Sequence, residues 1–134
     1  MNKIVRALIV VCFSIVAVAN AEVGQTDVID SIATKPDSNV AILLLFQERP
    51  WTKESFSLLS KKLAFYKLTI DSGQLAKQKP AISNKKLRVI IVYQSVPGAE
   101  FEIELKELQT AFGSESKDLY WGTQNEMLEL AKNP

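Results

Sequence analysis

Histidine is absent from this 134-residue chain, and cysteine occurs once, at position 12. Histidine is the commonest general base and the commonest transition-metal ligand, and a cysteine thiolate is a strong nucleophile. The sequence therefore excludes a Ser-His-Asp triad, a Cys-His dyad and a zinc site built from the usual ligands. We accordingly predict no catalytic residues, no metal ligands and no cofactor.

Glycine is also sparse: the five glycines never cluster, so the chain has no loop of the kind that cradles phosphate. Ser-x-x-Lys occurs at 83–86 and at 114–117, but both stretches are polar, and a solvated lysine is a poor base. Glu100, Glu104 and Glu107 recur on one side of an expected helix, which is typical of a solvated face. The alternative to a non-enzymatic protein is a small hydrolase or ligand-binding protein that uses Ser/Lys or carboxylates without His, Cys or metal.

The chain begins with two basic residues and an apolar run. Lys3 and Arg6 precede the run at residues 7–19, in which Ser14 is the only polar residue. Residues 19–21 (Ala-Asn-Ala) then match the small-x-small pattern of a signal peptidase site. The run is too short to cross a membrane, which takes about 20 apolar residues. We predict cleavage after Ala21, and an uncleaved N-terminal anchor is the alternative.

The domain organisation follows from this cut. Residues 1–21 are predicted to be a cleavable signal peptide, and residues 22–134 a single α+β domain. Removal of Lys3 and Arg6 takes the 16 basic residues to 14, against 15 acidic ones, and this balance argues against a nucleic-acid binder. The mature chain has no cysteine and no Asn-x-Ser/Thr sequon. We predict a bacterial protein that is periplasmic or secreted, with no stable membrane span after leader removal.

Apolar runs predict the strands. Residues 28–32 and 40–46 flank the segment 36–39 (Pro-Asp-Ser-Asn), whose turn-forming residues predict a β-hairpin. Residues 40–46 are apolar at every position, as in a central strand that is covered on both faces. Residues 87–93 are another β-branched run, and residues 119–121 predict a short edge strand.

The spacing of apolar residues predicts a long helix at 53–71. Its apolar stripe recurs at intervals of three and four residues, at Phe56, Leu59, Leu63, Tyr66 and Ile70. Thr52 is the expected N-cap, and Gly73 is the expected stop. A second helix is predicted at 101–112, and residues 127–131 indicate a short last helix.

These elements predict an α+β fold in the order β-β-α-β-α(-β/α). The predicted sheet has three to four strands and carries two main helices. It is mixed because the hairpin is antiparallel, whereas a strand, a long helix and a second strand favour a right-handed crossover and parallel pairing. A polar loop at 74–86 joins the first helix to the next strand. Because residues 40–46 are apolar on both faces, a further element must cover the far face. The C-terminal segment and a second protein are the two candidates.

Several short motifs lie around the long helix. Trp51 leads the helix, which carries Lys-Leu-x-x-Tyr at 62–66 and ends in Ser-Gly-Gln-Leu at 72–75. An Asp-x-Ile strand precedes them, at 27–29 or 30–32. The pattern resembles a family of small bacterial α/β proteins of unknown function. The resemblance implies the fold and transfers no catalytic residues, and the leader is a departure because that family is mainly cytoplasmic.

Charge is distributed unevenly along the chain. No acidic residue occurs between Asp71 and Glu100, a window that holds Lys77, Lys79, Lys85, Lys86 and Arg88. Ordinary surface charge is one interpretation, and a basic patch that meets an acidic partner or anionic lipid is the other. Leu58 and Phe65 lie opposite the core stripe, where they either pack beneath another element or form an exposed apolar strip. The candidate interface residues are therefore Leu58, Phe65, Lys77, Lys79, Lys85, Lys86 and Trp121.

The leading hypothesis is a non-enzymatic periplasmic protein-interaction module. Its partner is an unknown protein, with an acidic protein favoured by the basic loop and nucleic acid excluded by the total charge. An immunity-type protein and an accessory protein of the envelope are two concrete versions of this hypothesis.

Overall fold

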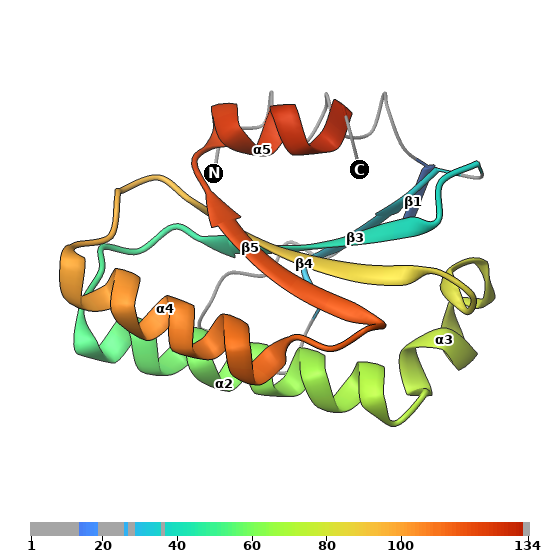
Figure 1. The fold of residues 1–134 in the computed structure, drawn as a ribbon, viewed down its shortest axis with the longest axis horizontal. Helices are drawn as coiled ribbons and strands as arrows, with labels where there is room; N and C mark the ends of the chain where they lie inside the picture. The colour runs from blue at the N-terminus through green and yellow to red at the C-terminus, as the bar shows by residue number, and fades with distance from the viewer. Residues whose placement is uncertain (1–13, 19–25, 27–28, 36, 133–134) are drawn as a thin grey trace.

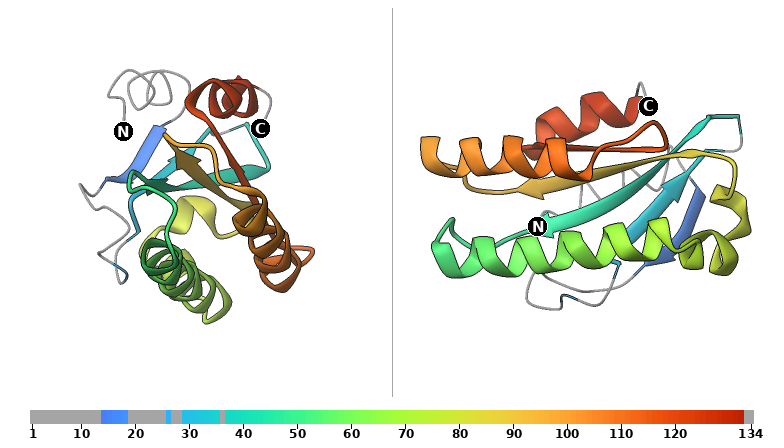
Figure 2. Two further views of the ribbon diagram at one scale, coloured as in Figure 1. Left: turned by 90° about the vertical axis from the view of Figure 1, so that its left-hand side faces the viewer. Right: turned by 60° about the horizontal axis from the view of Figure 1, so that its bottom comes forward.

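The computed structural model describes residues 14–18, 26, 29–35 and 37–132, which form one sheet with helices on both faces. Helices α2 (Lys53–Asp71) and α4 (Ala99–Phe112) lie side by side on one face, and α5 (Gln124–Lys132) lies on the other (Figures 1 and 2). Within these described ranges, no helix has the length and apolar character that crossing a membrane requires.

The sheet combines an antiparallel part with a parallel part. Its strands lie in the order β1-β2-β3-β4-β5; β1, β2 and β3 pair antiparallel, and β3, β4 and β5 pair parallel. The strand bounds are Ser14–Val18, Ser31–Thr34, Val40–Gln47, Lys86–Tyr93 and Lys117–Gly122. The predicted α+β class and the predicted hairpin are confirmed. Three to four strands were predicted, and β2 to β5 make four. A fifth strand, β1, comes from the predicted leader. Cleavage of the leader stays a prediction.

The long helix begins and ends as the sequence predicts. Thr52 and Ser55 cap α2 reciprocally, each side chain accepting from the other's backbone N–H at 3.0 Å. Gly73 takes φ 78°, a left-handed conformation that favours glycine. The predicted loop at 74–86 also contains a short helix, α3 (Gln74–Gln78), and a 3₁₀ turn, η1 (Pro80–Ile82). Both form because Leu75 and Ile82 are buried in the core.

Two hydrophobic clusters hold the layers together. The larger one joins α2 and α4 to the sheet, with Leu59, Leu63 and Tyr66 buried and Phe56 and Ile70 partly buried against it. On the opposite face, the second cluster contains Ala33, Ile42, Leu44, Phe46, Ile90, Val92 and Met127. Met127 belongs to α5, so the C-terminal segment covers the far face of the central strand. This segment was one of the two candidates that the sequence offered for that role.

Candidate partner-binding surface

The lysines between α2 and β4 are held by a short, well-anchored segment. Leu75 and Ile82 are only 3% and 2% exposed, so α3 and η1 are fixed to the core. Lys77 is exposed on α3, and Lys79 lies half-buried between α3 and η1. In Figure 1, α3 lies beside the end of the sheet where β4 begins. The segment therefore presents positive charge at the amino ends of the parallel strands.

The β2–β3 hairpin joins this positive surface. The Lys85 ammonium donates a hydrogen bond to the Lys35 carbonyl at 3.0 Å and another to the Ser38 carbonyl. These bonds tie together segments that are about fifty residues apart in sequence. We call the resulting surface the basic end, comprising Lys35, Lys77, Lys79, Lys85 and Lys86. Four of its residues were predicted from sequence, and Lys35 was not, because only the folded hairpin brings it there.

Asp118, on the neighbouring strand β5, is already engaged by cations of β4. Its two carboxylate oxygens accept from Arg88 at 3.1 Å each, and Lys86 lies 3.3 Å away. The bond to Asp118 raises the pKa of Arg88 above its ordinary value, and the guanidinium stacks 4.9 Å from the centre of the Tyr120 ring. Asp118 thus holds Arg88 and Lys86 in place on the side of the basic end that borders β5.

Asp71, at the end of α2, is engaged in the same way. Its carboxylate contacts Lys67 and Lys117 at 2.7 Å each. Hydrogen bonds from Lys117 and then Lys67 lower the pKa of Asp71 below its ordinary 3.8. A lowered pKa in the folded state means that the carboxylate stabilises the fold above about pH 3.8, and that this contribution is lost as the pH falls through the lower folded-state value.

We expect Asp71→Asn to be less stable than the parent at neutral pH, and we expect this difference to shrink as the pH falls below 3.8. Urea unfolding of both chains at a series of pH values measures the difference. Asp37→Asn is the matched control, because Asp37 is 77% exposed and 3.9 Å from its nearest described cation, Lys35. A difference between Asp71→Asn and the parent that stayed constant as the pH fell well below 3.8 would contradict this assignment.

Acidic residues gather at the opposite end of the sheet. Glu100 and Glu102 lie in the first turn of α4, where the helix dipole favours negative charge. The Glu126 carboxylate accepts from the backbone N–H of Thr123 at 3.1 Å and caps the start of α5. Burial, followed by the charges of Glu126 and Glu102, raises the pKa of Tyr93. Acidic residues therefore predominate at this end of the sheet, which also holds Lys53, and basic residues predominate at the other end, which also holds Asp37.

The predicted apolar and aromatic candidates are not part of this surface. Leu58 and Phe65 are half-buried on α2 and pack against the larger core cluster. Trp121 is half-buried against the same cluster from β5. The structure thus places the four predicted lysines on neighbouring segments at one end of the sheet. It leaves Leu58, Phe65 and Trp121 in separate packing positions.

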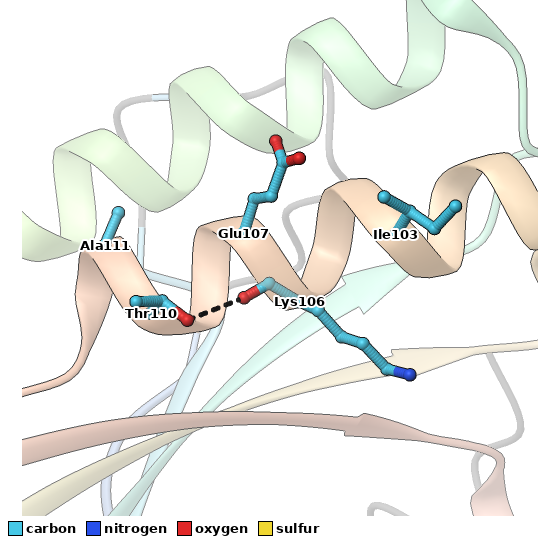
Figure 3. A pocket seen from close by; sticks show the side chains of 5 residues that line it. All are labelled: Ile103, Lys106, Glu107, Thr110 and Ala111. Atoms are coloured by element: carbon cyan, nitrogen blue, oxygen red, sulfur yellow. Dashed lines mark hydrogen bonds between the residues drawn. The ribbon is translucent and has the colours of Figure 1, made fainter.

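A different apolar side chain is exposed on α4. Ile103 is 61% exposed and borders an open hollow of about 520 Å³, shown in Figure 3 with Lys106, Glu107, Thr110 and Ala111. Glu107 and Ala111 point towards α2, and Lys106 points away from it (Figure 3). A narrower groove of about 140 Å³ between α2 and α4 also reaches Ala111. Both hollows are lined mainly by one or two helices, and they lack a set of convergent polar groups.

A buried ionic cluster underlies the sequence motifs of the long helix. Asp30 and Lys62 are fully buried and form an ion pair. The second Asp30 oxygen accepts from the Phe46 backbone N–H at 2.8 Å. The Tyr66 hydroxyl accepts from the Asp30 N–H and donates to the Leu44 carbonyl, both at 2.9 Å. Burial, and next the Asp30 charge, raises the pKa of Tyr66 well above 10, so the hydroxyl keeps its proton.

This cluster has the composition of a catalytic site but is closed to solvent. Its three side chains, Asp30, Lys62 and Tyr66, have no exposed surface. They connect β2, β3 and α2, so their geometry fits a structural role. Lys62 and Tyr66 belong to the Lys-Leu-x-x-Tyr motif, and Asp30 begins one of the two Asp-x-Ile positions. No pattern in the sequence indicates that the three residues meet.

The two Ser-x-x-Lys sequences are not arranged for catalysis. Lys117 lies 3.5 Å from the Ser114 hydroxyl, but its ammonium is paired with Asp71 and has no lone pair to accept a proton. Lys86 is paired with Asp118. A polar hollow of about 220 Å³ beyond β4 and β5 is lined by Tyr93, Gln94, Thr123, Gln124 and Asn125, which include no carboxylate and no ammonium.

The residues described above belong to a chain that matches a known protein family. A model of a family of unknown function, DUF6572, matches residues 21–125, so the chain belongs to this family. This agrees with the resemblance to a family of unknown function. Curated proteins and solved structures gave no match. The family match contains β2 to β5 and leaves out β1.

Proposed function

We propose that this DUF6572 member is a non-enzymatic protein of the bacterial periplasm, or a secreted one, that binds an acidic protein partner through its basic end. The observation that carries the proposal is the separation of charge along the sheet. The basic end gathers lysines from two distant segments, while Asp71 and Asp118 are engaged by Lys67, Lys117 and Arg88.

Charge separation of this kind suits recognition. Complementary potentials accelerate encounter and select among partners, even where they add little to affinity. Because α3 and η1 are anchored by buried side chains, the lysines are displayed from a fixed backbone, which reduces the entropy lost on binding. Export is supported by the signal-peptide pattern of residues 1–21.

Two versions of this role differ in the partner. An immunity-type protein would bind and neutralise a toxin that acts in the periplasm, and an accessory protein would bind another subunit of an envelope complex. Both need a rigid charged surface and no chemistry. The hydrolase or ligand-binding alternative gains no support from the described residues. The buried pair of Asp30 and Lys62 is closed to solvent, and Lys117, which contacts Ser114, is ion-paired with Asp71.

Reversing the charge of the basic end is expected to abolish capture of the partner. The test variant is Lys35→Glu with Lys77→Glu, and the matched control is Lys53→Glu with Lys106→Glu; all four side chains are exposed. Both variants change the net charge by the same amount, so only the position differs. Each tagged chain is used to capture proteins from a periplasmic extract, and the captured proteins are identified by cross-linking and mass spectrometry.

The parent and the control should capture the same acidic protein, with cross-links to Lys77 and Lys79, and the test variant should lose it. Equal capture by both variants would contradict the proposal. So would capture that disappears after nuclease treatment, since the ligand would then be a nucleic acid.

A further inference from the structure

The two edges of the sheet are not equivalent. On β5, the outward carbonyl of Leu119 accepts a hydrogen bond from the Gln109 side chain at 2.7 Å, and that of Lys117 accepts from the Ser114 N–H at 2.8 Å. The protein's own chain thus occupies outward acceptors of β5, as is common for protected edge strands. The other edge of the described sheet is β1, paired to β2.

The alternation of backbone hydrogen bonds shows which N–H and C=O groups of β2 point away from β3. The Lys86 N–H donates to the Asn39 carbonyl at 2.8 Å, so the odd-numbered residues of β3 face β4 and the even-numbered ones face β2. Residues Ser31 and Ala33, opposite Leu44 and Ile42, therefore face β3. The N–H and C=O groups of Ile32 and Thr34 point outward. We call these four groups the β2 edge.

The strand that occupies the β2 edge is β1. Residues of β1 lie antiparallel along it, with Ser14 opposite Thr34 and Ala17 opposite Ile32. They belong to the predicted leader and lie outside the family match at 21–125. Loss of residues 1–21 would leave β2 as an open edge, and such an edge is a template for an added strand.

Positive charge at one end of the β2 edge indicates which sequence an added strand should have. In antiparallel pairing, the start of the added strand lies beside Thr34, as Ser14 does, and the basic end begins one residue further on, at Lys35. Residues that precede the added strand would therefore approach Lys35 and Lys85. We infer that the β2 edge binds an extended segment of the partner in which acidic residues directly precede a short apolar stretch. This inference rests on the proposed function and specifies how its partner binds.

A designed peptide tests the inference. The full precursor is expressed, and its exported product is purified and its N-terminus is sequenced. A fluorescent peptide, Glu-Glu-Glu-Ser-Ile-Val-Ala-Val, combines three acids with the sequence of β1, and Ser-Ile-Val-Ala-Val-Glu-Glu-Glu is its order control. The first peptide should bind about tenfold or more tightly than the second, because only its acids reach the basic end. Equal binding, or an exported product that retains β1, overturns the inference.

Thr34→Pro and Thr34→Val isolate the contribution of the backbone. Proline removes the outward N–H of Thr34 and is tolerated where an edge N–H faces away from the sheet. Valine keeps the N–H and removes only the Thr34 hydroxyl, which has no hydrogen-bond partner among the described residues. Thr34→Pro should weaken binding of the first peptide about tenfold, the equivalent of one lost hydrogen bond, and Thr34→Val should leave it within about twofold. Circular dichroism and thermal unfolding check that both variants are folded.

The variants also separate this inference from the proposed function. If Thr34→Pro still captures the partner and Lys35→Glu with Lys77→Glu does not, the basic end binds without strand addition, and the inference is overturned alone. If all of these variants capture the partner, the proposed function fails as well. A parent that dimerises, with Thr34→Pro monomeric and neither binding the peptide, assigns the β2 edge to a second copy and overturns the inference.

Discussion

Replacing Asp30 with alanine is expected to lower the free energy of unfolding by about 3–5 kcal/mol. The substitution removes the carboxylate that pairs with the fully buried Lys62 ammonium, and it removes an acceptor of the Phe46 N–H. Removing one partner of a buried ion pair is strongly destabilising, because the remaining charge loses the interaction that offset its desolvation. Urea unfolding monitored by tryptophan fluorescence measures the loss.

Two further variants test the cause. Asp37→Ala removes a 77% exposed carboxylate and should change the free energy by less than about 0.5 kcal/mol. Asp30→Leu combined with Lys62→Met removes both charges and should regain much of the stability, because an apolar replacement of a buried ion pair is often neutral. An Asp30→Ala loss below about 1 kcal/mol would show that the pair is not buried as described.

Met127→Ala is expected to destabilise the protein by about 2–5 kcal/mol, the usual range for truncating a buried methionine. Met127 is fully buried and is the residue of α5 in the cluster that covers Ile42, Leu44 and Phe46. A nine-residue helix is marginal by itself, so packing rather than propensity keeps it on the sheet. Truncation should therefore loosen α5 and expose the strand face.

Denaturant unfolding measures the loss, and binding of the dye ANS under native conditions measures exposure of the strand face. Asn125→Ala, at an exposed position of the same helix, is the control and should change the free energy by less than about 0.5 kcal/mol. Unchanged stability and unchanged ANS binding in Met127→Ala would mean that another segment covers this face.

Local patterns in the sequence were sufficient to predict most of the fold. The long helix was predictable because its stripe has the helical period and because Thr52 and Gly73 mark its ends. The unbroken apolar run of β3 indicated that both faces are covered, and α5 covers the second one. The short helices α3 and η1 were missed because the stretch is polar and its two anchors, Leu75 and Ile82, are seven residues apart.

The surface and the ionic cluster depend on contacts that no local pattern specifies. The basic lysines were recognisable as a run without acids, but Lys35 joins them only through the folded hairpin and the bond from Lys85. Leu58 and Phe65 have the spacing of an exposed strip, and tertiary packing half-buries them. The pair of Asp30 and Lys62 spans 32 residues, and the sequence offered two equivalent positions for the acid.

The most direct test of the central claim is the ionic-strength dependence of the association rate between the mature chain and the acidic partner that it captures. Electrostatic steering by the basic end predicts a rate that falls steeply as salt rises, since screening shortens to about 8 Å at 0.15 M. At low salt, Lys35→Glu with Lys77→Glu should associate about tenfold or more slowly, and Lys53→Glu with Lys106→Glu should match the parent. A rate that is independent of salt and equal in all three chains would contradict the claim that this surface binds the partner.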